Sequence, residues 1–362
     1  MTSRAALEAE LLQWMHEEPL RRDDARFSRL ALGLFRFQFE HCAAYRRFCT
    51  GRGATPDKLG AWQEIPAVPA AAFKEVALRS FPGSATRRVF QTSGTAGERR
   101  GRLALDTLTL YEASLVPSFE AGVLGDLAPN QPVRLLVLAA SPQDAPDSSL
   151  SHMFGVMCAR RGAAGSGFFV RTGTLDIAAL EAACQQPGPP LALCGTAFAF
   201  VHWLDSLAER GVHLALPAGT RLMETGGFKG RTRERSRRAL YAELERRLGI
   251  PEARIINQYG MTELASQFYD QVLQHPHEPR YKGVPPWVRV RILEPESGHE
   301  QSPGKPGMIQ VVDLANTGSV AAIQTADLGH SLPGGFEVHG RAPGAEARGC
   351  SIAADEMLGG AE

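Results

Sequence analysis

The chain has few of the features that mark an exported or membrane-bound protein. Its six cysteines, spread over 362 residues, include no C-x-x-C pair and no evident disulfide framework. Such usage is typical of reduced thiols in a cytoplasmic protein. No apolar run is long enough to span a bilayer, and the N-terminal residues lead into an amphipathic pattern and not into a signal-peptide core. We therefore expect a cytoplasmic protein with no stable membrane association.

An excess of charge of one sign is also lacking. Basic and acidic residues number 39 each, so the overall charge gives no reason to expect a nucleic-acid partner. The sequence contains no internal repeat and no cysteine–histidine pattern with metal-ligand spacing. What it does have is an ordinary globular composition, 44% hydrophobic and 22% charged, in a chain long enough for a large core or two lobes.

Hydrophobic periodicity predicts helices near the N-terminus, followed by alternating strands and helices. Helices are expected over residues 4–18, 24–49, 107–121, from 148 onward, 175–184, 197–209 and 231–248, and strands over 88–90, 101–105, 133–140, 168–170, 191–194, 221–224 and 254–257. This alternation predicts an α/β fold with a substantially parallel sheet. Ligands of such folds bind at the carboxyl ends of the strands.

The chain after residue 285 changes character. Short strands, expected over residues 288–293, 307–312, 320–324 and 337–339, are separated by turns rich in glycine and proline. We therefore predict four parts: an N-terminal helical region (1–80), an α/β core (81–285), a β-rich subdomain (286–340) and a flexible C-terminal arm (341–362) that carries Cys350.

A loop of small residues and hydroxyls follows the first predicted strand. Within it, Thr92, Ser93 and Thr95 can donate hydrogen bonds to phosphate oxygens, while Gly94 and Gly97 allow the backbone to approach a bulky anion. The loop lacks the Lys-Ser/Thr ending of a Walker P-loop, so a P-loop NTPase is not indicated. In isolation, such a segment is also compatible with an ordinary surface turn.

A second segment of interest is Gln258-Tyr259-Gly260-Met261-Thr262-Glu263, after the strand predicted at 254–257. The Tyr259 ring can stack on an adenine, and Gly260 permits close approach. The Thr262 hydroxyl can hold a phosphate, and the Glu263 carboxylate can bind Mg²⁺, which bridges phosphates.

Together these segments resemble the motifs of the adenylate-forming enzymes, the superfamily of acyl-CoA ligases and peptide-synthetase adenylation domains. Two further matches follow in the same order: Thr325-Ala326-Asp327 resembles a Thr-Gly-Asp motif, and Gly340-Arg341 resembles the hinge. The resemblance implies an adenylate-forming core that uses ATP and Mg²⁺, with Asp327 on the ribose and Arg341 at the hinge. Departures are Ala96 and Ala326, and Glu98-Arg99 where the superfamily has a lysine.

The resemblance implies roles for other residues. Gly226 and Gly227 would pass beneath the adenine ring, and Lys229 would reach a phosphate or the substrate carboxylate. His152, Gly195 and Thr196 would border the pocket for the carboxylate substrate. For His152, a role as a helix cap or packing residue is the alternative interpretation.

The superfamily's C-terminal lid domain, with its catalytic lysine, is expected to be truncated here to a short arm, because the sequence ends at Glu362. That arrangement resembles the long-chain acyl-protein synthetases of the LuxE type. The resemblance implies that a fatty acid is activated as acyl-AMP, transferred to Cys350 as a thioester, and passed to an acyl-CoA-reductase-type protein partner. A thiolate is a strong nucleophile toward a mixed anhydride.

Other interpretations stay open. The chain would be a small acyl- or aryl-CoA ligase if CoA is the acceptor and Cys350 is incidental. It would be a non-catalytic acyl-carrier or scaffold subunit if the departures from the motifs reflect lost adenylation. The sequence specifies neither the acyl chain length, the pathway nor the reductase, and it leaves homo-oligomerisation open.

Overall fold

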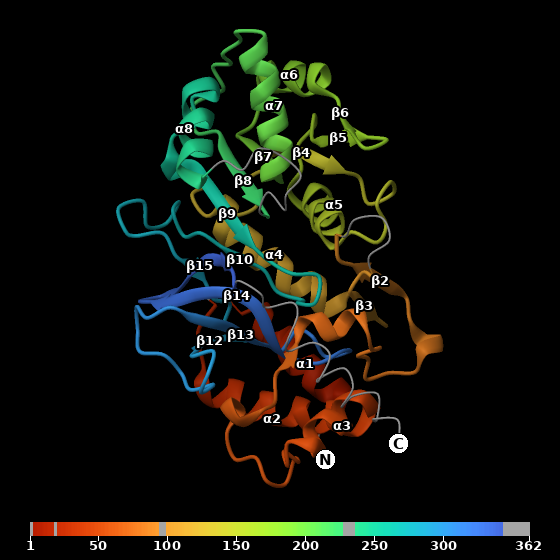
Figure 1. Ribbon diagram of the computed structural model, residues 1–362. Helices are drawn as coiled ribbons and strands as arrows, with labels where there is room; N and C mark the ends of the chain where they lie inside the picture. The colour runs from red at the N-terminus through yellow and green to blue at the C-terminus, as the bar shows by residue number, and fades with distance from the viewer. Residues whose placement is uncertain (1–2, 18–19, 94–98, 227–235, 343–362) are drawn as a thin grey trace. The chain divides into compact units, whose positions relative to one another are not determined.

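The computed structural model describes residues 3–17, 20–93, 99–226 and 236–342, which form two compact units (Figure 1). Unit 1 takes its described residues from Met1–Pro117, Met261–Gln267 and Gly283–Glu362, and unit 2 from Ser118–Gly260 and Phe268–Lys282. The boundary runs through the segment 258–263, so Tyr259 belongs to unit 2 and Glu263 to unit 1.

Unit 2 is built on a seven-stranded sheet in the order β10-β9-β8-β7-β4-β5-β6. The neighbouring pairs from β9 to β5 are all parallel, and the edge strands β10 and β6 are antiparallel to their neighbours. The strands are β4 (Arg134–Ala140), β5 (Gly167–Arg171), β6 (Thr174–Leu175), β7 (Leu191–Thr196), β8 (Arg221–Thr225), β9 (Ile255–Tyr259) and β10 (Phe268–Tyr269). The prediction of a largely parallel sheet is confirmed.

Helices cover both faces of this sheet, which is why its central strands are continuous apolar runs. The helices are α5 (Ser149–Arg161), α6 (Ile177–Gln185), α7 (Ala197–Glu209), α8 (Arg237–Leu248) and the short η4 (Glu252–Arg254). Side chains of α6, α7 and α8 share one buried cluster with Leu136, Leu193 and Leu222 of the sheet. On the other face, Tyr269 meets Met153 of α5 and Phe119 of α4. Figure 1 shows α4 and α5 on the side of the sheet opposite α6, α7 and α8.

The N-terminal helices of unit 1 correct one prediction. Residues 24–49 were expected to form one helix, but they form two, α2 (Asp24–His41) and α3 (Ala43–Gly51), after α1 (Arg4–Met15). The break lies at Cys42, whose φ of −107° and ψ of 98° are those of extended backbone. Cys42 is buried there, as are Phe35 and Tyr45 on either side, so tertiary packing overrides the helical periodicity.

The β-rich part of unit 1 is an antiparallel sheet in which β15, β14, β13 and β12 pair in that order, with β1 parallel to β14. Its strands are β1 (Val68–Pro69), β12 (Val288–Leu293), β13 (Gly307–Asp313), β14 (Ala322–Leu332) and β15 (Gly335–Arg341), and β11 (Lys282–Gly283) lies at the unit boundary. β14 is longer than predicted and includes the whole Thr325-Ala326-Asp327 segment.

Unit 1 also contains the hairpin that leads into and out of the predicted phosphate loop. Its strands β2 (Arg88–Gln91) and β3 (Arg102–Leu105) pair in a two-stranded sheet, and α4 (Thr109–Leu124) then carries the chain into unit 2. Short 3-10 turns are η1 (Trp62–Glu64), η2 (Ala70–Lys74) and η3 (Gly83–Ala85). The α/β fold class is confirmed, and the four-part division stays a prediction. Among the described residues, none of the helices combines the length and apolar character needed to cross a membrane.

Candidate active site

Thr92 is held where the β2–β3 hairpin opens into the loop. Its N–H donates to the carbonyl oxygen of Gly101 (2.9 Å), and its Oγ1 accepts from the N–H of Gly101 (2.8 Å). The Arg100 Nε also donates to the Thr92 carbonyl oxygen (2.6 Å). Thr92 is therefore fixed by three hydrogen bonds, while Ser93 next to it is exposed. The predicted loop residues Gly94, Thr95 and Gly97 lie outside the described residues.

The structure brings Glu263 to this hairpin, although 171 positions separate it from Thr92 in the chain (263 minus 92). Both side chains lie close to Gly101. A Cβ built at Gly101 would lie 3.2 Å from Glu263 Oε1 and 3.5 Å from Thr92 Oγ1. Glycine at 101 therefore permits a buried carboxylate, 6% exposed, to lie beside a hydroxyl. Gly101 was predicted only as the first residue of a strand, because nothing local in the sequence indicates this contact.

The turn that carries Glu263 is held by a buried aspartate that sequence analysis did not single out. Asp313, at the end of β13, accepts hydrogen bonds from the N–H groups of Ala265 (2.9 Å), Ser266 (2.7 Å) and Ala315 (3.0 Å), and from Ser266 Oγ (2.8 Å). Burial raises the pKa of the Asp313 carboxyl overall, although these donors act in the opposite direction. Asn316 Nδ2 adds a hydrogen bond to the Glu263 carbonyl oxygen (2.9 Å).

The same turn is also held by a small buried network that meets it at Ser266. The Trp287 indole N–H donates to Ser114 Oγ (2.9 Å) and to Ser266 Oγ (3.1 Å), and the two serine hydroxyls are 2.8 Å apart. All three residues are fully buried. Because both networks tie the residues that follow Glu263 to the core of unit 1, the Glu263 carboxylate is attached to a rigid support.

Asp327 and Arg341 are direct partners on the antiparallel strands β14 and β15. The N–H of Asp327 donates to Thr325 Oγ1 (3.1 Å), and that hydroxyl donates to the Ile309 carbonyl oxygen (2.7 Å). Arg341 is exposed, and the preceding Gly340 has a φ of +122°, a conformation that favours glycine. The structure thus pairs the two residues predicted for the ribose and the hinge.

In unit 2, the predicted residues lie at the carboxyl ends of neighbouring strands. Tyr259 ends β9, with its ring centroid 5.9 Å from that of Phe268, and the exposed Gly260 follows. Gly226 follows β8 with a φ of +83°. The strand ends are tied together because Thr225 Oγ1 donates to the Gln258 carbonyl oxygen (3.1 Å). The predicted residues Gly227 and Lys229 lie outside the described residues.

The predicted pocket residues of unit 2 have structural roles as well. A Cβ at Gly195 would lie 2.9 Å from Leu138 Cβ, so the close approach of β4 and β7 requires glycine there. Thr196 caps α7, since its Oγ1 accepts from the Ala199 N–H (3.2 Å). His152 lies in the first turn of α5, where its N–H donates to the Ser148 carbonyl oxygen (3.0 Å). Their contact with a substrate stays a prediction.

A buried ionic network lies beneath the end of β9 and was also missed from the sequence. Asp270 accepts from Lys282 Nζ (2.5 Å), Arg280 Nη1 (2.9 Å) and the Asn257 N–H (3.1 Å). Burial alone would raise the pKa of Asp270, but the two cations lower it overall. Burial likewise lowers the pKa of Lys282 and raises that of nearby Glu224, which accepts from Asn257 Nδ2 (2.8 Å).

Five of the six cysteines lie within the described residues, and all five are free thiols. Burial raises the pKa of Cys158 to about 11 and the pKa of Cys49 and Cys184 to about 12, and it also raises the pKa of Cys42 and Cys194. A thiol with such a pKa is a poor nucleophile at neutral pH. The predicted acyl acceptor, Cys350, lies outside the described residues.

The fold is similar to that of a solved CoA ligase. An open conformation of 2-hydroxyisobutyryl-CoA ligase, solved in complex with 2-HIB-AMP and CoA, matches with a TM-score of 0.62 at 16% identity, over 90% of this chain and 76% of that chain. At that level of identity the likeness concerns the fold alone, and it confirms the predicted fold class.

The family follows from the sequence match. A profile of the family "Acyl-protein synthetase, LuxE" matches residues 4–359, and the chain belongs to this family. The long-chain-fatty-acid–luciferin-component ligase of Aliivibrio fischeri is 23% identical over 325 residues, which are 88% of this chain and 81% of the relative. The ligase of the same name from Vibrio harveyi is 24% identical over 311 residues, 83% of this chain and 78% of the relative. The chain is therefore a ligase of the acyl-protein synthetase type.

Proposed function

We propose that this protein activates a long-chain fatty acid with ATP and then acylates itself on Cys350 before passing the acyl group to an acyl-CoA-reductase-type partner. The observation that carries the proposal is that the Glu263 carboxylate and the Thr92 hydroxyl both lie next to Gly101, beside the β2–β3 hairpin, in a member of an acyl-protein synthetase family. Both curated relatives are named as long-chain-fatty-acid ligases, which supports the substrate class.

In the first step, a carboxylate oxygen of the fatty acid attacks the α-phosphorus of ATP. The bond to the bridging oxygen breaks, pyrophosphate leaves with the electron pair, and acyl-AMP remains. The roles we assign are positioning and charge stabilisation, which dominate such phosphoryl chemistry. Thr92, Ser93 and the loop up to Gly97 would bind phosphates, together with Lys229 and Thr262. Tyr259, Gly226 and Gly227 would face the adenine, and Asp327 the ribose.

The donor chemistry around Gly101 suits Mg²⁺, which takes oxygen ligands. Glu263 supplies a buried carboxylate and Thr92 a hydroxyl, and Asp313 and Asn316 hold the turn that carries the carboxylate. When bound, Mg²⁺ would neutralise charge on the phosphates. Glu263 is the residue that we assign to hold it.

In the second step, the Cys350 thiolate attacks the carbonyl carbon of acyl-AMP. The bond to the phosphate oxygen breaks, AMP leaves with the electron pair, and the thiol proton is lost to solvent. The raised pKa values of Cys158, Cys49 and Cys184 keep these thiols protonated at neutral pH, which makes them poor acceptors and supports Cys350 as the acceptor. The free thiols also support a cytoplasmic location, where reduced cysteines are the rule.

The adenylation step is tested by fatty-acid-dependent exchange of pyrophosphate into ATP. Glu263→Gln should lower the exchange rate ~10²–10³-fold, the range seen when one preorganised electrostatic group is removed. Glu300→Gln is the matched control, because Glu300 is an exposed carboxylate of the same unit that pairs with Arg291. If Glu263→Gln exchanges like wild type, the metal assignment fails, and if wild type shows no exchange, the scaffold alternative is favoured.

The CoA-ligase alternative gives a different result. If CoA is the acceptor, added CoA will accelerate AMP release in Cys350→Ser as strongly as in wild type. Under our proposal, AMP release by Cys350→Ser stays slow with or without CoA, because acyl-AMP has no acceptor thiol.

A further inference from the structure

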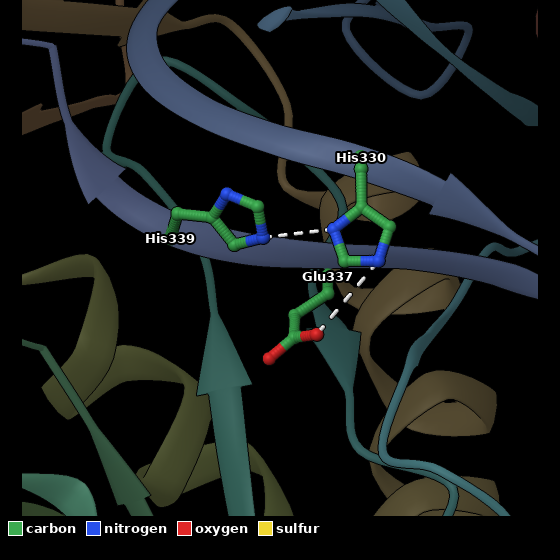
Figure 2. Close-up of side chains that lie close together, drawn as sticks. All are labelled: His330, Glu337 and His339. Carbon is green, nitrogen blue, oxygen red and sulfur yellow. Dashed lines mark hydrogen bonds and ion pairs between the residues drawn. The ribbon is translucent and has the colours of Figure 1, made fainter. Parts of the chain in front are cut away.

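Three side chains that commonly bind metals converge on the hairpin formed by β14 and β15. His330 lies on β14, and Glu337 and His339 lie on β15 (Figure 2). One ligand atom from each residue lies within 4.8 Å of the other two. This His330–Glu337–His339 cluster contains none of the residues assigned a role in the proposed function.

The hairpin geometry explains why the three side chains meet. His330 and Glu337 are direct cross-strand partners, so their side chains point to the same face of the sheet. His339 is the extra residue of a β-bulge, since Leu328 pairs with Gly340 and Gly329 with Val338. A bulge commonly re-aims a side chain, and here the His339 ring comes to lie beside that of His330.

The two nitrogens of the His330 ring face different partners: Nδ1 lies 2.8 Å from His339 Nε2, and Nε2 lies 3.9 Å from Glu337 Oε2. Only one of these nitrogens can bind a shared ion, and with one ligand atom from each residue the three atoms still lie within 4.8 Å of one another. Without an ion, one ring donates a hydrogen bond to the other. The short distance between the rings is therefore compatible with both the metal-free and the metal-bound cluster. The side chains of His330 and Glu337 are 17% and 37% exposed, which leaves an entry path from solvent.

We propose that this cluster binds a divalent transition metal of the zinc class and cross-links the two strands of the hairpin. Two imidazole nitrogens and one carboxylate oxygen form a donor set that zinc uses, and it leaves a fourth position for water. Imidazole suits zinc, nickel and copper, whereas magnesium prefers oxygen donors, so the cluster would not compete with Glu263 for magnesium. No local spacing marks this site in the sequence, because His330 and Glu337 meet only as cross-strand partners and His339 joins them only through the bulge.

The bound metal would stabilise the bulge that precedes the predicted hinge. His339 lies two positions before Arg341, and His330 three positions after Asp327. A metal that ties β14 to β15 would therefore fix the register of the strands between these two residues. The consequence is measurable without any enzyme assay, so this inference and the proposed function can fail independently.

The test is titration of the chelator-stripped full chain with Zn²⁺ by calorimetry, in excess Mg²⁺ to occupy oxygen-only sites. Wild type should bind one more Zn²⁺ than His339→Ala does, or the variant should bind that ion with an affinity more than ~100-fold lower. Loss of a direct ligand should exceed the ~10–100-fold loss of metal affinity that removal of an outer-shell partner causes. Zinc bound by thiols or by Glu263 is bound equally by both proteins, so it does not contribute to the difference between their stoichiometries. His213→Ala is the matched control, an exposed histidine of unit 2 that should bind zinc like wild type.

Two further measurements separate a lost ligand from a lost fold. Zinc should raise the unfolding temperature of wild type but not that of His339→Ala, while the two proteins should unfold alike in chelator. X-ray absorption of the zinc form should show two imidazoles, at a Zn–N distance of about 2.0–2.1 Å. The proposal is overturned if the double variant His330→Ala/His339→Ala binds zinc with the stoichiometry and affinity of wild type.

Discussion

Each unit contains a buried aspartate that supports candidate site residues. The environments of the two aspartates shift their pKa values in opposite directions. In unit 1, Asp313 accepts hydrogen bonds from neutral groups only among its described partners, and its pKa is raised by burial. In unit 2, Asp270 is paired with Lys282 and Arg280, and its pKa is lowered despite burial. The same side chain is therefore tuned by whether its partners carry charge.

The opposite pKa shifts of Asp270 and Asp313 make their contributions to stability depend on pH in opposite directions. A lowered pKa means that Asp270 stabilises the fold above the ordinary Asp value of 3.8, and that this stabilisation is lost as the pH falls through its folded pKa. A raised pKa means the reverse for Asp313, whose contribution is greatest below 3.8 and is lost as the pH rises through its folded pKa. The turn at Glu263 is therefore supported by an aspartate that contributes less to the free energy of unfolding at neutral pH than at low pH.

Removing one of the two cations from the ionic network should give the largest effect. Lys282→Met leaves Asp270 with one charged partner fewer in a fully buried site, and we expect unfolding to become easier by ~3–5 kcal/mol. Urea unfolding measures this change. Lys305→Met, at an exposed position, should stay within ~0.5 kcal/mol of wild type. A loss below 1 kcal/mol in Lys282→Met would mean that the network contributes little.

Removing the neutral network should affect both stability and activity. Asp313→Ala leaves four donors without their acceptor, and buried unsatisfied donors cost ~1–3 kcal/mol each, so we expect a loss of about 3 kcal/mol after relaxation. Because the turn carries Glu263, pyrophosphate exchange should also fall, by ~10²-fold for a displacement near 1 Å. Unchanged exchange in a folded Asp313→Ala would show that the network does not position Glu263.

The opposite pKa shifts give the smallest but most specific test. Urea stability is measured from neutral pH downward for wild type, Asp313→Asn and Asp270→Asn. Relative to Asp313→Asn, wild type should gain stability as the pH falls. Relative to Asp270→Asn, wild type should lose stability as the pH falls below 3.8. Differences of the same sign for both pairs would contradict the comparison.

Local sequence patterns predicted much of the fold, because strands buried on both faces and amphipathic helices have strong signatures. The helix at 197–209 and the strand at 288–293 were predicted with the observed bounds. The single helix expected over 24–49 was wrong, because buried Cys42 interrupts a periodicity that continues on both sides of it.

The site was only partly predictable, for a different reason. Thr92 and Glu263 could be selected from residue types and order, but their meeting at Gly101 depends on tertiary structure. Asp313, Asp270 and Lys282 carry no local motif, since their partners lie up to 48 positions away. The roles of Gly94, Lys229 and Cys350 stay predictions.

The central claim is self-acylation, and intact mass of the protein after incubation with ATP, Mg²⁺ and a mixture of fatty acids tests it most directly. Wild type and Cys158→Ser, which removes a half-buried thiol with a pKa of about 11, should both gain one acyl mass that hydroxylamine removes. Cys350→Ser should gain none while still forming acyl-AMP. An adduct of equal yield on Cys350→Ser, or none on wild type despite active pyrophosphate exchange, would contradict the account.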